Sequence, residues 1–494
     1  MEDMARSADY ESLHFVLLPH LAQGHLIPMM DMARLIARRG PSVTVITTPL
    51  NAARSRSTVD RAARSGLRIC LLEVPFPSSE AGLPLGCESM DSLPSRSLFK
   101  NLLIGIRMLQ KPVEEILLRL EPKPSCLISD KNVMWANETA GKLGIPRIAF
   151  DGTSCFSLLC THRIIESKAY ETVPEGNPFV VPGLPDQIEL TRAQLPGAVN
   201  IGGPSDMKEI RDDIRLKELA AYGVISNTFE ELEPAYVEGF RKVRGKVWCI
   251  GPMSIVNEHR LDKAERGESA AMGADKCLSW LDLWGSNSVI YACLGSMSRP
   301  SRPQLIELGL GLEASKRPFI WAVRDGYKTE EFDCWMKESG FEDRIKGRGL
   351  LIRGWAPQVL ILSHPAIGGF VTHCGWNSTL EGVCAGVPMV AWPMFAEQFY
   401  NEKMIVQVLG IGVSLGSAVA IKWGEEGKFG KVVKKEMVEK VIAELMGERE
   451  DAQARRRRAM VVGEMAKKAM EEGGSSYLNL TAFMEDIRQQ TPRH

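Results

Sequence analysis

The side chains best suited to hold a ligand are concentrated in residues 355–398, WAPQVLILSHPAIGGFVTHCGWNSTLEGVCAGVPMVAWPMFAEQ. An apolar run that predicts a buried strand over 366–371 is followed there by a Gly-containing turn and by a helix that opens at Trp376 and Asn377. The free N–H groups and the positive dipole end of such a helix favour an anionic group. We therefore predict a phosphate-binding strand–turn–helix unit at this point of the chain.

The polar residues near this helix opening extend the same interpretation. His373, Asn377 and Ser378 supply donors around it, and Glu381 lies four residues after Asn377, on the same helix face. A carboxylate at that place can accept hydrogen bonds from the hydroxyls of a sugar diol. Trp355 can stack on a flat base. Together these residues predict a ligand that contains a base, a sugar and phosphate.

The whole stretch resembles the plant secondary product glycosyltransferase box, which is the donor-binding signature of family 1 UDP-sugar glycosyltransferases, and it matches that box in length. The resemblance implies that Trp355 stacks on uracil, that Ala356 meets the base edge through its backbone, and that Gln358 lies near the base and ribose. It implies that Glu381 binds the ribose hydroxyls. By the same resemblance, the diphosphate of the UDP-sugar is held by His373, Trp376, Asn377 and Ser378. The sugar hydroxyls are bound by Glu397 and Gln398.

Two residues outside the box carry the predicted acid–base chemistry. His25 follows the first predicted strand, and Asp130 lies at the carboxyl end of the strand predicted over 126–130. Imidazole has an ordinary pKa close to working pH, which suits it to take the proton of an attacking hydroxyl. In the family that the chain resembles, His25 matches the general base and Asp130 the acid that orients its ring. His20, at the end of the first strand, is expected to be structural.

The elements that must position these residues alternate between strand and helix. Strands are predicted over 14–19, 42–48, 67–74, 126–130, 147–150, 223–226 and 247–250, and then over 289–294, 319–323 and 350–352 before the box. This alternation indicates an α/β fold with parallel sheets covered by helices. By resemblance we expect the GT-B architecture, two facing Rossmann-like domains with the chemistry in the cleft between them.

The chain divides into four predicted parts. They are an acceptor-binding Rossmann-like domain (1–250), a polar linker (251–275), a UDP-sugar-binding Rossmann-like domain (276–475), and a final helix (476–494) that by resemblance packs back on the first domain. Ser296 lies in a turn after the strand 289–294, where its hydroxyl and the nearby amides can face the diphosphate.

The acceptor is expected to meet the first domain. The Pro-, Gly- and Ser-rich loop 75–97 is long, and such loops in compact domains are usually functional or disordered. It is similar to the corresponding loop of glycosyltransferases that act on flavonoids, triterpenes, steroid hormones and cytokinins. We therefore expect this loop, and the helical segment 153–165, around the acceptor. Asp151 fits either an acceptor contact or a helix N-cap.

Composition excludes other classes of partner. The formal charge is −1 and 24% of residues are charged, so no overall field recruits nucleic acid or an anionic membrane. The 11 cysteines form no C-x-x-C pair, which indicates free thiols in a reducing compartment. No apolar stretch reaches the roughly 18 residues of a membrane span, and the N-terminus lacks a signal-peptide pattern. We expect a cytoplasmic monomer.

Other functions fit the sequence less well than a UDP-sugar glycosyltransferase. The segment 309–314, GLGLEA, fits the dinucleotide fingerprint of an oxidoreductase, but it is predicted inside an amphipathic helix, whereas the fingerprint must join a strand to a helix. A binding protein that has lost catalysis is disfavoured by intact His25 and Asp130. C-glycosylation of a phenolic ring remains the rival chemistry. No carboxylate pair is placed to hold a divalent ion, so neither a metal nor a cofactor is expected.

The sequence thus leads to one main hypothesis. It is an inverting UDP-glycosyltransferase that moves glucose from UDP-glucose, its co-substrate, to a hydroxyl of a small lipophilic plant metabolite such as a flavonoid, triterpene, steroid or hormone. Glucose is expected because Gln398 is the residue that the family associates with glucose use. The acceptor hydroxyl would attack the anomeric carbon from the face opposite UDP.

Overall fold

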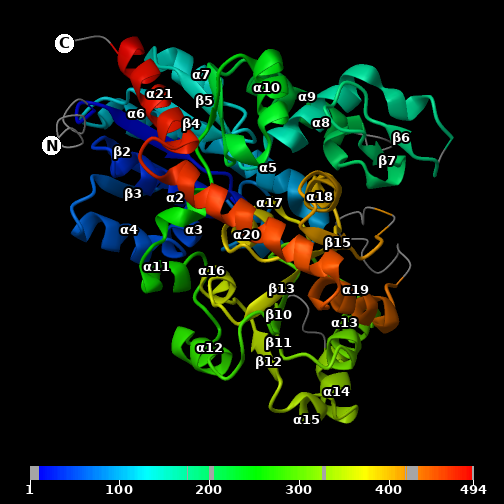
Figure 1. Cartoon of the computed structure of the whole chain (residues 1–494). Coiled ribbons are helices and arrows are strands. Elements are labelled where there is room, and N and C mark those ends of the chain that lie inside the picture. Colours follow the sequence, from blue (N-terminus) through cyan, green and yellow to red (C-terminus); the bar gives the residue numbers. More distant parts are fainter. Residues whose placement is uncertain are drawn as a thin grey trace.

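The computed structural model describes residues 10–174, 176–199, 205–324, 330–417, 419 and 432–491. Two parallel sheets, each flanked by helices, form the two halves of the molecule (Figure 1). The predicted α/β class with two parallel sheets is confirmed. Within the described ranges, no helix is both long enough and apolar enough to cross a membrane.

The first sheet has seven parallel strands in the spatial order β3-β2-β1-β4-β5-β8-β9. Their bounds are β1 (His14–Leu18), β2 (Ser42–Thr47), β3 (Ile69–Glu73), β4 (Cys126–Asp130), β5 (Arg147–Asp151), β8 (Gly223–Ser226) and β9 (Val247–Cys249). All five residues of β1, HFVLL, are buried, as apolar runs in a doubly covered parallel sheet should be. Because β1 pairs with β4, with Leu18 opposite Ser129, the residues that follow these two strands meet at one edge of the sheet.

The second sheet has six parallel strands in the order β12-β11-β10-β13-β14-β15. Their bounds are β10 (Val289–Cys293), β11 (Phe319–Val323), β12 (Gly349–Arg353), β13 (Ile367–Thr372), β14 (Met389–Ala391) and β15 (Gly412–Ser414). β10 and β13 are central neighbours, so the turns after them also share an edge. A small antiparallel pair, β6 (Phe179–Val180) and β7 (Glu189–Leu190), lies apart from both sheets.

Helices separate the strands. Those of the first half are α2 (Gln23–Ala37), α3 (Pro49–Ala53), α4 (Arg56–Arg64), α5 (Phe99–Met108), α6 (Gln110–Arg119), α7 (Ala136–Leu143), α8 (Cys155–Ser167), α9 (Ser205–Leu219) and α10 (Pro234–Arg244). Those of the second half include α12 (Ala274–Leu281), α13 (Arg302–Ala314), α14 (Glu330–Glu338), α15 (Phe341–Ile345), α16 (Gln358–Leu362), α17 (Trp376–Cys384), α18 (Gln398–Lys403) and α19 (Lys435–Met446). The GLGLEA segment lies inside α13, so it is not a dinucleotide-binding turn.

The segment predicted as a polar linker is more ordered than its composition indicates. It contains the short helix α11 (Arg260–Ala264), and both Asn257 and Asp262 are buried. Arg34 of α2 donates to Asn257 Oδ1 at 2.6 Å and to Asp262 Oδ2 at 2.5 Å. The polar side chains that indicated a solvated connector are therefore paired with the first half of the chain.

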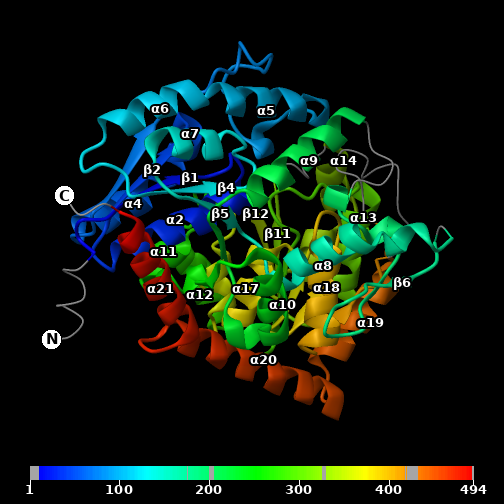
Figure 2. The same ribbon diagram turned by 90° about the horizontal axis from the view of Figure 1, so that it is seen from above.

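The last two helices return the chain from the second half to the first. α20 (Glu450–Met470) runs along one side of the molecule and is followed by α21 (Ser475–Gln490) (Figure 2). Phe483 of α21 lies 5.5 Å from the ring of Phe15 in β1 and 5.1 Å from the ring of Trp248 in β9. The C-terminal helix thus packs on the first sheet.

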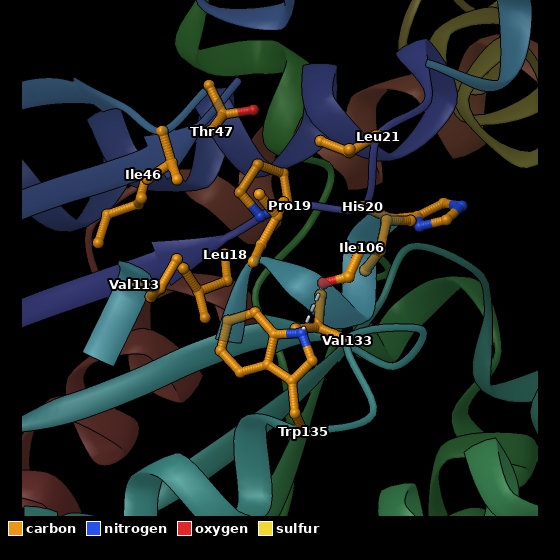
Figure 3. Close-up of a pocket in the computed structure, with 12 residues that line it drawn as sticks. Leu18, Pro19, His20, Leu21, Ile46, Thr47, Ile106, Val113, Val133 and Trp135 are labelled. Carbon is orange, nitrogen blue, oxygen red and sulfur yellow. Dashed lines mark hydrogen bonds between the residues drawn. The ribbon is translucent and has the colours of Figure 1, made fainter. Parts of the chain in front are cut away.

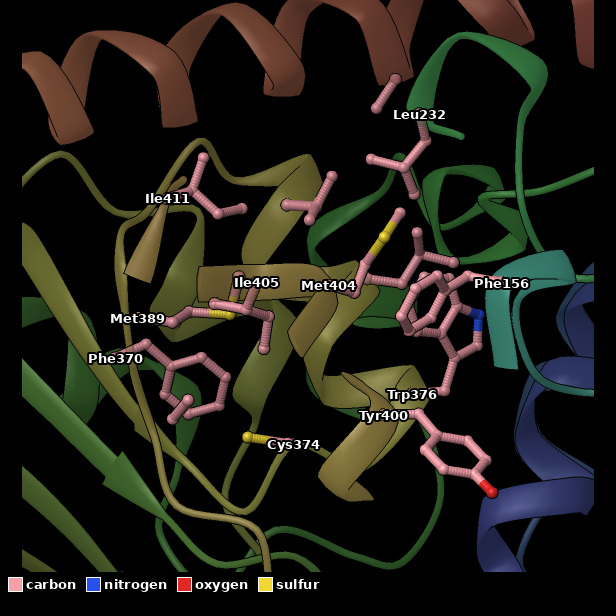
Figure 4. Packing of buried hydrophobic residues seen from close by; sticks show 14 of the residues in the cluster. Phe156, Leu232, Phe370, Cys374, Trp376, Met389, Tyr400, Met404, Ile405 and Ile411 are labelled. Atoms are coloured by element: carbon pink, nitrogen blue, oxygen red, sulfur yellow. The ribbon is translucent and has the colours of Figure 1, made fainter. Parts of the chain in front are cut away.

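One buried apolar cluster contains residues of both halves, among them Phe156 and Leu232 from the first and Trp376 and Met404 from the second (Figure 4). The indole Nε1 of Trp376 donates to the carbonyl of Asn227 at 2.7 Å. This contact fixes the start of α17 against the first half of the chain, and it brings the edges of the two sheets together.

Candidate functional site

His25 and Asp130 meet at the carboxyl edge of the first sheet. α2 begins directly after β1 and carries His25 in its first turn, while Asp130 is the last residue of the neighbouring β4. His25 Nδ1 lies 2.7 Å from Asp130 Oδ2. The other carboxylate oxygen accepts from the backbone N–H and the side-chain amide of Asn132, both at 2.9 Å. The Asp130 side chain is fully buried and that of His25 is 34% exposed, so the imidazole alone reaches outward.

The electrostatics of this pair suit a general base. Burial lowers the pKa of His25, but the charge and hydrogen bond of Asp130 more than offset it, so the pKa lies above its ordinary value. Burial raises the pKa of Asp130, but His25 and the Asn132 amide hold it well below its usual range. The carboxylate is ionised and keeps the Nδ1 proton of the ring in place, which leaves Nε2 to accept a proton.

His20 is not part of the acid–base pair. Its ring packs edge-on against His25 at 5.1 Å, and its Nε2 lies 3.3 Å from Met90 Sδ. Burial, reinforced by the neighbouring His25, lowers the pKa of His20 to about 4, so the ring is neutral at working pH. Met90 comes from the loop predicted to cover the acceptor, and its backbone N–H bonds to Leu21 at 2.9 Å. That loop therefore lies over the turn that leads to His25.

The unit predicted to bind phosphate has the expected strand–turn–helix form. β13 ends at Thr372, and α17 begins after Gly375. Asn377 Nδ2 donates to the carbonyl of Gly24 at 2.7 Å, which places the first turn of α17 against the turn that carries His25. In the described part of the chain, Asn377 Oδ1 is buried without a hydrogen-bond partner.

The turn after β10 lies against the same helix opening. A Cβ atom at Gly295, which has a φ of +78°, would lie 2.4 Å from the ring of His373, so the turn that contains Gly295 and Ser296 approaches that ring closely at Gly295. Burial lowers the pKa of His373 to about 4, so its ring is neutral and can donate one hydrogen bond. The indole N–H of Trp376 already donates to the carbonyl of Asn227. At the helix opening, Trp376 therefore offers a ligand its backbone N–H.

The residues assigned to base and ribose also come together. Gln358 Nε2 donates to Glu381 Oε2 at 2.7 Å and to Ser378 Oγ at 2.9 Å. The carbonyl of Ala356 accepts from the backbone N–H of Gln358 at 2.8 Å. Trp355 is half-buried three residues before α16, and the guanidinium of Arg324 lies 4.6 Å from the centre of its ring.

A residue that the sequence analysis missed completes this group. Arg266 donates through Nη1 to Glu381 Oε1 and through Nε to Asp31 Oδ2 of α2 at 2.8 Å. All three side chains are nearly buried. Gly267, with a φ of +97°, lies so close to Trp355 that a Cβ atom there would be 2.4 Å from the indole. No periodicity or spacing distinguishes Arg266 from the other charges of its polar segment.

The residues predicted to read the sugar lie at the start of α18. Gln398 is 3% exposed, and its Oε1 accepts from the N–H groups of Met394 at 2.9 Å and Phe395 at 3.1 Å. Its Nε2 is the group that can donate to a sugar hydroxyl. Burial raises the pKa of Glu397. The Glu397 carboxylate also interacts electrostatically with Lys131, Asp151 and His25. The start of α18 therefore faces the catalytic edge of the first sheet.

Asp151, for which two roles were predicted, is not a helix cap. Ser154 caps α8, since its Oγ accepts from the N–H of Ser157 at 3.1 Å. The Asp151 carboxylate instead accepts from Lys131 Nζ at 2.5 Å.

A small apolar cavity of about 30 Å³ lies next to His20 (Figure 3). Leu18, His20, Ile106, Val133 and Trp135 are among the residues that line it. The indole N–H of Trp135 is bonded to the carbonyl of Ile106 at 2.9 Å, so the ring presents its apolar face.

Comparison with known proteins identifies the family of the chain. A family model described as UDP-glucoronosyl and UDP-glucosyl transferase matches residues 274–442. UDP-glycosyltransferase 73C3 of Arabidopsis thaliana is 51% identical over 483 residues, and UDP-glycosyltransferase 73C12 of Barbarea vulgaris is 52% identical over 480 residues; each alignment covers 97% of both chains.

Solved structures show the same similarity. UGT73P12 of Glycyrrhiza uralensis, complexed with glycyrrhetinic acid 3-O-monoglucuronide, has a TM-score of 0.89 and 37% identity over 97% of this chain and 96% of its own. TcCGT1, in complex with UDP, has a TM-score of 0.78 and 27% identity over 97% of this chain and 100% of its own. The chain therefore belongs to the plant family 1 UDP-glycosyltransferases and has their GT-B fold.

Proposed function

We propose that this enzyme transfers glucose from UDP-glucose to a hydroxyl of a small lipophilic plant metabolite, with inversion at the anomeric carbon and His25 as general base. The observation that carries the proposal is the geometry around α17. The Asn377–Gly24 bond joins the phosphate-binding helix to the turn that holds His25, and Asp130 fixes the ring of His25. These two contacts support a leaving diphosphate at the start of α17 and a proton acceptor at His25, close to each other.

The proposed reaction is a single displacement. His25 Nε2 takes the proton of the acceptor hydroxyl while its oxygen attacks the anomeric carbon, and the bond from that carbon to the UDP oxygen breaks. The negative charge that develops on the diphosphate is stabilised by the N–H groups at the start of α17, by the His373 ring and by the turn that contains Ser296. These groups do not require a metal ion, and we propose that none takes part.

The donor assignment rests on the residues at the start of α18 and on the nucleoside contacts. Trp355, Ala356 and Gln358 are proposed to hold the uridine, and Glu381 its ribose hydroxyls. Gln398 is proposed to select glucose, because its amide is held by two backbone N–H groups and so presents Nε2 in one orientation. Glu397 accepts from the sugar hydroxyls.

The acceptor class is proposed from the apolar cavity next to His20 and from relatives. The cavity beside His20 is lined almost entirely by apolar side chains. Among relatives of known structure, one is complexed with glycyrrhetinic acid 3-O-monoglucuronide, another with quercetin, and Phytolacca americana UGT2 with UDP-2fluoro-glucose and pterostilbene. We propose a triterpene, flavonoid, steroid or hormone as acceptor.

The test incubates the purified protein with UDP-glucose and a panel of such acceptors and measures product mass. His25→Ala should reduce turnover by about 100-fold or more, in line with the usual contribution of a general base, while UDP binding by calorimetry is unchanged. His364→Ala is a matched control, since His364 pairs with Asp282 at 3.1 Å before the start of β13, at the end away from the α17 opening, and it should leave turnover unchanged.

The outcome that defeats the general-base assignment is near-normal turnover of His25→Ala on an unactivated alcohol. Product that resists acid hydrolysis would instead show C-glycosylation of a phenolic ring.

A further inference from the structure

We propose that Lys131 and Asp151 form the polar side of the acceptor site, and that they select acceptors carrying a second hydroxyl besides the one that reacts. The inference rests on the proposed function, because it assigns a selectivity to the same acceptor site.

The two residues are brought to the catalytic edge by neighbouring strands. β4 ends at Asp130, β5 ends at Asp151, and the two strands pair in parallel with Asp130 opposite Phe150. Lys131 therefore follows the residue that orients His25, and its Nζ lies 2.5 Å from Asp151 Oδ2. The pair is part of the same edge as the general base.

The pair can still bind a ligand. An ammonium group has three donors and a carboxylate has several acceptor positions, whereas the bond between them uses one of each. The side chain of Lys131 is 31% exposed and that of Asp151 is 4% exposed, so the donor end is the accessible one. A donor and an acceptor side by side complement a hydroxyl, which both accepts and donates.

A purely structural role explains this pair less well. Asp151 does not cap α8, since Ser154 does. Burying an ion pair has a large desolvation cost that its attraction often fails to repay, and apolar residues of similar size are often as stable. Burial lowers the pKa of Lys131, but Asp151 and Glu218 more than offset it, so the ammonium remains charged.

The surroundings indicate which ligand the pair meets. Val133, two residues after Lys131, lines the apolar cavity together with His20. An acceptor whose reacting hydroxyl lies at His25 thus meets the Lys131–Asp151 pair at the same sheet edge, and the apolar residues around His20 lie next to it. This arrangement favours an apolar skeleton with two hydroxyl groups over the same skeleton with one.

The test measures kcat/KM with saturating UDP-glucose for two acceptors of one skeleton, a diol and the matching mono-ol. The native enzyme should favour the diol by about 10- to 100-fold, the usual value of a hydrogen bond to a charged group. Lys131→Met and Asp151→Asn should reduce this preference to within about threefold, through lost rate on the diol. Lys131→Arg should retain most of the preference. KM for UDP-glucose should not change.

The control is Lys142→Met, which removes an exposed lysine of α7 paired with Glu114 at 3.1 Å, and it should keep the diol preference. If a single variant unfolds, the double variant Lys131→Gln/Asp151→Asn, which leaves no unpaired charge, provides the same comparison.

Three results would overturn the inference. They are a native enzyme that does not distinguish diol from mono-ol, variants that lose rate equally on both, and variants whose KM for UDP-glucose rises, which would place the pair at the sugar. Transfer to no acceptor at all would defeat the proposed function itself, and this inference with it, whereas transfer without discrimination defeats only this inference.

Discussion

The region proposed for catalysis (the catalytic region), His25 with Asp130, and the region proposed to hold the nucleoside (the nucleoside region), Trp355, Gln358 and Glu381 with Arg266, are built in opposite ways. In the catalytic region a single hydrogen bond of 2.7 Å joins two residues from neighbouring strand ends, and the imidazole is partly exposed. In the nucleoside region the Glu381 carboxylate is bonded on one side by Gln358 and on the other by Arg266, whose second partner is in α2.

Because of this difference, substitutions in the two regions are expected to change different properties, namely turnover in one and stability with donor binding in the other. The catalytic pair is small and makes few contacts beyond its own edge, so changing it should affect rate more than folding. The nucleoside region joins three distant parts of the chain through buried charges, and removing one charge leaves the others without a partner. Its substitutions should affect the free energy of unfolding as well as donor binding.

The largest expected effect is on rate, in the catalytic region. Asp130→Asn should lower turnover by about 100- to 10,000-fold, because the amide no longer holds the Nδ1 proton and no longer stabilises the imidazolium. Activity should fall as pH decreases and His25 becomes protonated. Since Asp130 holds the pKa of His25 above its ordinary value, the midpoint of kcat/KM should lie above about pH 6.5 in the native enzyme and move to lower pH in the variant. A midpoint unchanged by Asp130→Asn would contradict this.

The next effect is on stability, in the nucleoside region. Arg266→Met should lower the free energy of unfolding by about 3 to 5 kcal/mol, because Asp31 and Glu381 would remain buried without their cation. The matched control is Arg38→Met, which breaks the pair with Glu258, whose side chains are 35% and 65% exposed. It should cost less than about 1 kcal/mol. Equal losses in urea-induced unfolding would contradict the expectation that the buried charges around Arg266 stabilise the fold more than a surface ion pair does.

A smaller effect concerns selectivity between donors. The native enzyme should prefer UDP-glucose to UDP-galactose, and Gln398→Ala should reduce that preference by about 10-fold, the value of one hydrogen bond. Inhibition by UDP should change little, because the hydrogen bonds of Gln398 go to Met394 and Phe395 and not to the nucleoside region. Equal native rates with the two donors would show that Gln398 does not select the sugar.

The smallest expected effect is that of a chelator. Diphosphate departure is assigned to the α17 amides, His373 and the Ser296 turn, so excess EDTA should leave turnover unchanged. Loss of activity that magnesium or manganese restores would contradict the assignment.

Much of the fold was predictable because it depends on local patterns. The strand over 126–130 and the strand over 319–323 have the predicted bounds, since apolar runs between turn residues identify strands of a buried parallel sheet. The region 251–275 was less predictable. Its polar composition indicates a solvated connector, whereas the structure pairs Asn257 and Asp262 with Arg34, a residue more than 220 positions away in the chain.

The same distinction holds for the site. His25, Asp130 and the helix opening at Trp376 are recognisable from neighbouring residues. Arg266 is not, because its importance lies in Asp31 and Glu381, which no local pattern connects with it. The sequence does not decide whether Asp151 is an acceptor contact or a helix cap. The choice depends on Ser154, which caps α8, and on Lys131, which follows another strand.

The course of the chain also limits how the two domains can move. The backbone passes from the first sheet to the second after Cys249, and it returns through α20 to α21, whose Phe483 packs on β1 and β9. The polypeptide thus connects the two domains at two points. Rotation about the line through those points leaves both crossings unstrained, whereas sliding or twisting strains at least one. Substrate entry and product release should therefore follow one angular coordinate, and cross-linking α21 to β9 should leave that rotation free.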